Sequence, residues 1–254
     1  MNIIVCAKQV VDISEVKIDE NTKKPLLEGV EKKISDIDKN AMEEALRIKE
    51  TFGGEIKVLT LGLPEAKENI KELLAVGGDE AFLVKTKGDE DYYEASCLLA
   101  KAIEKIGDFD IILCGEASID QFSGQMGPRI AALLDIPQIT YAQKVDAETK
   151  EITVEKNLGD RLVIMQSSYP VLITVTKEIN EPRLPSLMQI LASSNKPITE
   201  WDSQSLIEIS EPKVEIVELK GLITERKNIV FEDDKIEDAV KKVVENVIKD
   251  GVLG

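Results

Sequence analysis

Short runs of apolar residues alternate with helix-like periods through residues 1–140, and this alternation restricts the fold more than any other feature. Four runs are apolar enough to form buried strands: Ile3–Ala7, Ile56–Leu61, Ala81–Val84 and Ile111–Cys114. The segments between them repeat apolar residues at i, i+3 and i+4, which indicates amphipathic helices. Buried strands separated by such helices are typical of an α/β fold with a mostly parallel sheet, which we therefore predict.

Local signals set the expected bounds of four helices. One spans 38–52 and is closed by Gly53-Gly54, a second begins at Pro64, and a third spans about 91–106. The fourth is expected at about 124–134, with its inner face formed by Met126, Ile130, Leu133 and Leu134. We expect Ser123 to be the N-cap of this fourth helix.

Several segments depart from the alternation. Residues 14–34 resemble a hairpin with a turn at Asp19–Thr22, and strands are expected at 152–155, 162–166 and 171–176. Residues 177–201 hold Pro182, Pro185 and Pro197, too many prolines for a central strand. We predict an extended arm over 203–234 and a last amphipathic helix over 235–249. The expected division is a domain at 1–200 that includes the 177–201 segment, followed by an arm and helix at 202–254.

Composition excludes several classes of function. The chain of 254 residues has no histidine, which removes Ser-His-Asp and Cys-His catalysis and every His-ligated metal site. Its net charge of −16, without a basic patch, disfavours nucleic acid and anionic membrane surfaces. No apolar run approaches the roughly 20 residues that span a bilayer. Neither a signal peptide nor a CxxC motif is found, so we expect a cytoplasmic protein with three reduced cysteines, no metal site and no membrane insertion.

The strongest local feature is the polar loop that follows the strand at 111–114. Ligands of open α/β sheets collect at the carboxyl ends of strands, and here small residues lead into a helix N-terminus, where backbone N–H groups attract anions. Gly124 permits close backbone approach, and Asp120 is suited to a ribose hydroxyl or to organising the loop. An ordinary capped turn explains the same residues equally well. Neither GxGxxG nor GxxxxGK[ST] is present, so a Rossmann fingerprint or P-loop is disfavoured.

Five segments, in order along the chain, resemble the electron-transfer flavoprotein beta (small) subunit family. The signature loop is matched by Ile119-Asp120-Gln121-Phe122-Ser123-Gly124-Gln125-Met126-Gly127-Pro128. The other matches are Val5–Val10, Glu43–Glu50, Leu73–Glu80 and Thr176–Arg183. The resemblance covers residues 1–200 and is more specific than any single motif.

The resemblance implies a flavodoxin- or Rossmann-like adenine-nucleotide-binding domain that acts as an electron-carrier subunit. Family members pair with an alpha subunit that holds most of an FAD. The beta subunit binds a second adenine nucleotide, which is a structural AMP in conventional members. In flavin-bifurcating members of anaerobes it is a second FAD, reduced by NADH. The matching nucleotide-binding residues here are Cys6, Ala7, Ser35, Asp36, Ile37, Asp38, Leu61, Ser118, Ile119, Asp120, Gln121, Phe122, Ser123, Gly124, Gln125, Met126 and Gly127.

The chain departs from the family pattern at Ser35-Asp36, where Asn-Pro is common, and at Glu116-Ala117 and Gln121-Phe122. Glu116 replaces a family lysine and is electrostatically unfavourable near a phosphate. The hairpin and the helix start at Asp38 are more similar to members from anaerobes, so we favour the bifurcating type. The alternatives are a conventional AMP-binding subunit and a free-standing nucleotide-binding module.

The resemblance also implies that residues 179–201 dock onto a flavin dehydrogenase of the acyl-CoA or hydroxy-acid type. Leu187, Ile190 and Leu191 share one face of a short predicted helix, as anchors of a docked helix do. Ordinary core contacts under a loop would explain the same spacing. Glu178 and Arg183 are expected to brace this segment, or, for Arg183, to contact the flavin domain.

Overall fold

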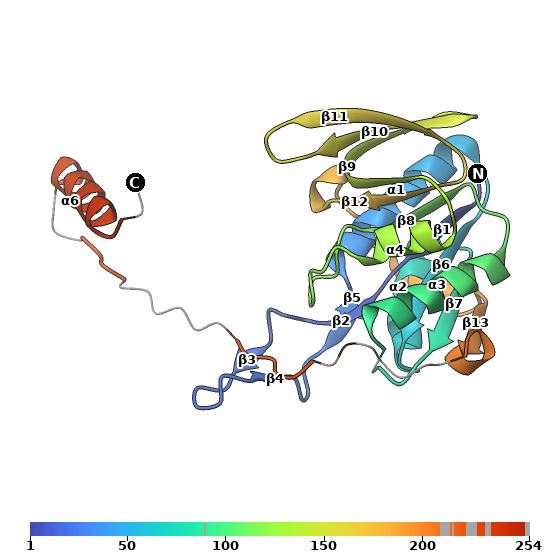
Figure 1. The fold of residues 1–254 in the computed structure, drawn as a ribbon, viewed down its shortest axis with the longest axis horizontal. Helices are drawn as coiled ribbons and strands as arrows, with labels where there is room; N and C mark the ends of the chain where they lie inside the picture. The colour runs from blue at the N-terminus through green and yellow to red at the C-terminus, as the bar shows by residue number, and fades with distance from the viewer. Residues whose placement is uncertain (89, 209–213, 215, 222–227, 232–234, 252–254) are drawn as a thin grey trace.

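A nine-stranded sheet organises the computed structural model, which describes residues 1–88, 90–208, 214, 216–221, 228–231 and 235–251 (Figure 1). Its strands are β1 (Ile3–Cys6), β6 (Ile56–Gly62), β7 (Glu80–Lys85), β8 (Ile111–Gly115), β9 (Gln138–Ala147), β10 (Glu151–Asn157), β11 (Leu162–Ser168), β12 (Val171–Val175) and β13 (Ile198–Asp202). Their order is β11-β10-β9-β12-β8-β1-β6-β7-β13. In this spatial order every neighbouring pair from β9 through β12, β8, β1, β6 and β7 to β13 is parallel, whereas β10 and β11 add to β9 as antiparallel strands. The predicted α/β class with a mostly parallel sheet is confirmed.

Helices cover both faces of the sheet. α1 (Asp36–Phe52) and α2 (Ala66–Val76) pack on one face, and α3 (Tyr92–Ile106) and α4 (Met126–Leu133) on the other. The first three of these helices match the predicted ones to within two residues. Asp91 accepts hydrogen bonds from the N–H groups of Tyr93 and Glu94, which fixes the start of α3.

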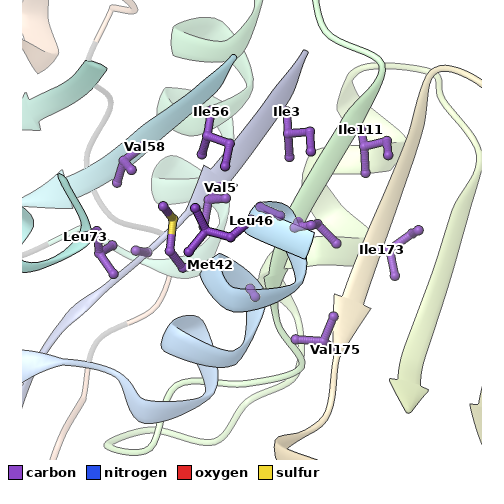
Figure 2. Packing of buried hydrophobic residues seen from close by; sticks show 14 of the residues in the cluster. Ile3, Val5, Met42, Leu46, Ile56, Val58, Leu73, Ile111, Ile173 and Val175 are labelled. Carbon is purple, nitrogen blue, oxygen red and sulfur yellow. The ribbon is translucent and has the colours of Figure 1, made fainter. Parts of the chain in front are cut away.

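The core between α1, α2 and the sheet forms because successive strand residues point to opposite faces. Ile3 and Val5 face this layer, whereas Ile4 and Cys6 face α3 and α4. Figure 2 shows Met42 and Leu46 of α1 directed at Val5 and Val58 of the strands. The apolar stripe of α1 thus seats its first turn beside the carboxyl ends of the central strands.

Two strands of the nine-stranded sheet were not predicted from the sequence. β9 buries only Ile139 and Ala142, and its other residues mix polar side chains with partly buried or exposed apolar ones, so it lacks the signal of a buried strand. β13 follows Pro197 and pairs only with β7, at the edge of the sheet. This position agrees with the expectation that the proline-rich segment holds no central strand.

The predicted hairpin is confirmed as β3 (Lys17–Ile18) and β4 (Pro25–Leu26), beside a second small sheet of β2 (Gln9–Val11) and β5 (Lys32–Ile34). Much of the predicted arm lies outside the described residues. Where it is described, the Gly221 N–H donates to the Lys23 carbonyl of the hairpin, 2.8 Å away. The last predicted helix is confirmed as α6 (Ile236–Lys249), which buries no residue in this chain (Figure 1). Among the described helices, none has the length and apolar character needed to cross a membrane.

Candidate functional site

The carboxyl ends of β1 and β8 form the topological switch of the sheet. From β1 the chain proceeds outward to β6 and β7, and then returns through α3 to β8 on the other side of β1. The connections on either side of this point lie on opposite faces of the sheet. We call the carboxyl ends of β1 and β8, with the residues around them, the crevice. Such a crevice is the usual ligand site of an open α/β sheet.

Asp38, in the first turn of α1, joins the two strand ends. One carboxylate oxygen accepts the Lys8 N–H at 2.8 Å, and the other accepts the Gly115 N–H at 2.9 Å. Burial raises the pKa of Asp38 to about 7, although these two hydrogen bonds and the Lys8 charge oppose the shift. Asp38 is therefore a buried carboxyl group at the floor of the crevice, and its pKa lies close to neutral pH.

Lys8 links the residues after β1 to the loop between β8 and α4. Its Nζ lies 2.8 Å from Oδ2 of Asp120 and 3.0 Å from Oε1 of Gln121. The loop turns sharply at Phe122, where φ is +46° and the N–H donates to the Ser118 carbonyl at 2.9 Å. Phe122 is 66% exposed, so it is held at the rim of the site rather than in the core.

Two glycines allow backbone to approach closely around the crevice. A Cβ on Gly115 would lie 2.7 Å from Oδ1 of Asp38, and one on Gly127 would lie 2.4 Å from Cγ2 of Thr174. Both positions therefore exclude any side chain, which brings α1 and α4 against the strand ends.

The predicted cap of the fourth helix is wrong. α4 begins at Met126, the N-cap position is Gln125 rather than Ser123, and no side chain caps the first turn. Gly124 has a φ of +64°, so the chain makes a left-handed turn there and delays the helix by two residues. The first N–H groups of α4 are left without a side-chain cap, which suits an anion.

The buried thiols of Cys6 and Cys114 near the site are unreactive, and the carboxyl groups of Glu116 and Glu178 lie at its rim. Burial, with a smaller effect from Asp38, raises the pKa of Cys6 to about 12, and burial raises that of Cys114 strongly. Burial and then the nearby Glu178 carboxylate raise the pKa of Glu116. Neither cysteine is a nucleophile at neutral pH.

The structure gathers most of the predicted nucleotide-binding residues at this edge of the sheet. Cys6 and Ala7 end β1, Leu61 lies near the end of β6, and Ser35 to Asp38 form the start of α1. The remainder, Ser118 to Gly127, form the loop and the first turn of α4. The Ser35 hydroxyl is fully buried and has no hydrogen-bond partner among the described residues.

Two cations at the site were missed by the sequence reasoning. Lys8 lies two residues after the end of β1, so its position near a strand end was the available signal. Arg129 lies one turn into α4 and donates from Nε and Nη2 to Oε1 of Gln125, at 3.1 and 2.9 Å. The i, i+4 spacing of Gln125 and Arg129 was the signal for this contact.

The predicted partner-binding residues form a second group. Leu187, Ile190 and Leu191 lie on α5 (Leu187–Ser193) and are 72%, 47% and 61% exposed. Arg183 pairs with carboxylates of α1, whereas Glu178 lies in the short 3-10 helix η1 (Lys177–Ile179), near Glu116 of the loop between β8 and α4. In the described part of the chain, no three His, Cys, Asp or Glu side chains are grouped so as to hold a metal ion.

Comparison with known proteins identifies the family. Residues 26–206 match the model of the electron transfer flavoprotein domain. The electron transfer flavoprotein subunit beta of Thermoanaerobacterium thermosaccharolyticum is 39% identical over 97% of this chain and 98% of its own length. The caffeyl-CoA reductase-Etf complex subunit CarD of Acetobacterium woodii is 39% identical over 81% of this chain and 80% of its own. The chain therefore belongs to the electron-transfer flavoprotein beta-subunit family.

Proposed function

We propose that this chain pairs with an alpha subunit to carry electrons through FAD, and that its own crevice binds a second FAD for flavin-based electron bifurcation with NADH. The observation that carries the proposal is the topological switch at the carboxyl ends of β1 and β8, in a chain that matches a beta subunit along nearly its whole length. Similarity to CarD, a subunit of a caffeyl-CoA reductase-Etf complex, supports the bifurcating type.

The residues at the crevice fit an adenine nucleotide. Gly115 and Gly127 leave no room for side chains, the buried Ser35 hydroxyl lacks a partner among the described residues, and Lys8 supplies positive charge. The uncapped first turn of α4 is suited to a phosphate. A flavin bound there would supply the redox chemistry, so the protein's part is to bind, orient and exclude water.

The site needs no acid or base from this chain. Asp38 fixes the distance between the ends of β1 and β8, and Lys8 holds the nucleotide loop over them. Cys6 and Cys114 form an unreactive floor because their thiols stay protonated.

Exposed apolar residues of the arm and the last helix support an alpha-subunit partner. α6 displays an apolar stripe that no described residue of this chain covers: Ile236, Val240, Val243, Val244 and Ile248. The described arm residues Val214, Ile216, Val217 and Leu219 are also exposed. A stripe of this size on a charged helix is typical of a protein interface.

The α5 region supports docking of a flavin dehydrogenase. Its exposed apolar side chains lie within eight residues of sequence: Leu184, Leu187, Met188, Ile190 and Leu191. Helix-in-groove recognition uses anchors of this kind. We place the complete assembly in the cytoplasm, in keeping with three free cysteines.

The test is to release the nucleotides from the purified heterodimer with acid and to count FAD against AMP. We expect about two FAD per heterodimer and reduction of the protein by NADH. One FAD with one AMP would overturn the bifurcating assignment in favour of a conventional subunit. A colourless, active monomer would overturn the electron-carrier assignment altogether.

A Lys8→Met heterodimer tests whether the crevice is the binding site. We expect it to retain the alpha-subunit FAD and to lose much of the second nucleotide. Lys101→Ala is the matched control, because Lys101 also pairs with one acidic residue but lies on α3, outside the crevice. Equal nucleotide content in both variants would contradict the assignment of this site.

A further inference from the structure

α1 carries three polar side chains that are buried although they point away from the sheet. Asn40, Glu43 and Glu44 are 2%, 5% and 6% exposed and share one face of the helix by their i, i+3, i+4 spacing. Burying such groups is costly unless each is paired. Within α1, Arg47 pairs with Glu43 at 3.2 Å and lies 4.0 Å from Glu44. All the hydrogen-bond partners outside α1 lie in residues 177–183, the segment that leads to α5.

Asn180 is held by two of these residues. The Asn40 side-chain amide donates to the Asn180 carbonyl at 2.7 Å and lies 3.2 Å from the Lys177 carbonyl. In return, the Asn180 amide donates to the Asn40 carbonyl at 3.0 Å and to Glu44 at 3.1 Å. This reciprocal pairing fixes backbone of both segments.

Arg183 is held by Glu43, the third of these buried polar residues. Its Nε donates to Oε2 of Glu43 at 2.8 Å and its Nη2 to Oε1 at 3.0 Å, a bidentate pair, while its backbone N–H also donates to Glu43 at 3.1 Å. A second contact joins the guanidinium to Glu50, about two helical turns further along α1. Burial pushes the pKa of Glu43 upward, but the hydrogen bonds from Arg183 outweigh it and lower the pKa. Glu43 is therefore an ionised carboxylate matched to Arg183.

The other end of α5 is fixed as well. Lys196 donates from Nζ to the carbonyls of Leu74 and Gly78 at 2.9 and 2.7 Å, at the C-terminus of α2. Immediately afterwards the chain enters β13, which pairs with β7. α5 itself has a capping box of Ser186 and Gln189 and packs against α2.

We propose that these contacts act as a two-ended clamp that presents the exposed side chains of α5 in a fixed arrangement, with Asn180, Arg183 and Lys196 as positioning residues for the docking of a flavoprotein dehydrogenase. This inference rests on the proposed function. A preformed docking helix does not have to be ordered when the partner binds, so it binds more tightly than a mobile loop with the same side chains. The buried polar face of α1 is then explained by the need to hold the segment, since apolar residues there would leave its carbonyls and amides unpaired.

The experiment compares heterodimers that carry Arg183→Ala, Arg183→Lys and Lys101→Ala, with an acyl-CoA dehydrogenase of the same organism as the probe. We expect Arg183→Ala to raise the KM for the dehydrogenase at least tenfold with kcat within about twofold of wild type. Hydrogen exchange should accelerate in 184–193 and remain unchanged in α3. Arg183→Lys, which keeps the charge but loses the bidentate geometry, should be intermediate, and Lys101→Ala should match wild type.

Leu187→Ala with Leu191→Ala tests docking itself, since it trims the exposed face and leaves the clamp intact. An unchanged KM in this variant would refute docking at α5, and the proposed function would fail on that point. A raised KM here together with an unchanged KM in Arg183→Ala would refute the clamp alone. Accelerated exchange in 184–193 without any change in KM would also refute it, because the fixed arrangement would then serve no docking.

Should Arg183→Ala fail to assemble, Asn180→Ala and Lys196→Met decide the question. Each removes contacts at only one end of the segment and leaves the Glu43 carboxylate paired with Arg183. We expect each to raise the KM and the exchange rate in 184–193. Wild-type values of both quantities in both variants would overturn the proposal.

Discussion

Gly127 lies in the first turn of α4 and has no room for a side chain. Its replacement by alanine tests how closely α4 packs against the sheet beside the crevice. An added Cβ would lie 2.4 Å from Cγ2 of Thr174 and 3.3 Å from Sγ of Cys114. Carbon atoms pack best at about 3.5–4.0 Å, so the helix or the strand has to move. Overpacking of this kind costs about 1–3 kcal/mol.

Two further terms set the expected magnitude. Alanine is more favourable than glycine in a helix by about 1 kcal/mol, so Gly127→Ala should lower the free energy of unfolding by about 0–2 kcal/mol. Thr174→Ser removes the clashing Cγ2 and keeps the hydroxyl that accepts the Tyr141 N–H at 3.1 Å. Alone, it should cost about 1 kcal/mol for the lost buried methyl group. In the double variant the alanine methyl fills the space of the lost threonine methyl. The cost of about 1–3 kcal/mol expected from adding the two single effects should therefore disappear.

The assay is native-state hydrogen exchange of the β8 and β12 amides in the purified protein, under conditions where exchange follows the opening equilibrium. The central strands report global opening of the domain, so ratios of rates give differences in free energy. Gly127→Ala combined with Thr199→Ser on β13 is the matched control and should be additive. Additivity of Gly127→Ala and Thr174→Ser within about 0.5 kcal/mol would refute the contact and with it the close seating of α4.

Other residues of the crevice give shorter tests. The pKa of Asp38 in the folded protein (about 7) lies above the ordinary 3.8, so the stability contributed by its proton is lost as the pH rises from about 4 to 7. This pH-dependent component should be absent in Asp38→Asn. Hydrogen exchange of the β1 amides at several pH values measures it. Identical pH dependence in both proteins would contradict it. Iodoacetamide at pH 8 should label Cys97 before the buried Cys6 and Cys114, as peptide mass spectrometry will show; earlier labelling of either buried thiol would count against their burial. Lys8→Met should accelerate exchange in the loop at 118–124 by an amount equivalent to at most about 1 kcal/mol, and no acceleration would mean that the loop is held by other contacts.

The alternation of strands and helices was predictable because burial on both faces leaves a continuous apolar run, as in Ile111–Cys114. β9 was not, since it pairs with a parallel strand on one side and an antiparallel strand on the other and buries only Ile139 and Ala142. Its place inside the sheet depends on pairing with β12, where Leu172 lies opposite Gln138, and no local pattern encodes that contact. β13 was hidden for a related reason, because an edge strand needs little apolar character.

The residues of the site were predictable where polar side chains directly follow a strand in the sequence. They were not predictable where a role depends on contacts between elements that are far apart in the sequence. The loop after β8 stands out by its small and polar residues. By contrast, Asp38 acquires its role only because the apolar stripe of α1 seats it between Lys8 and Gly115, 30 and 77 residues away in sequence. The failure of Ser123 as a cap has a similar origin, since the left-handed turn at Gly124 depends on the packing of the loop.

α1 connects the two halves of the proposed function through its register alone. Its apolar stripe, Met42 and Leu46 among others, fixes the rotation of the helix on the sheet. With that rotation set, Asp38 falls on the strand ends, while Asn40, Glu43 and Glu44 fall on the segment that holds α5. Successive residues of a helix are separated by about 100°, so a shift of even one residue would remove both sets of contacts together. The polar face formed by Asn40, Glu43 and Glu44 is therefore structural, and the crevice and α5 are positioned by one rigid element rather than by two independent loops.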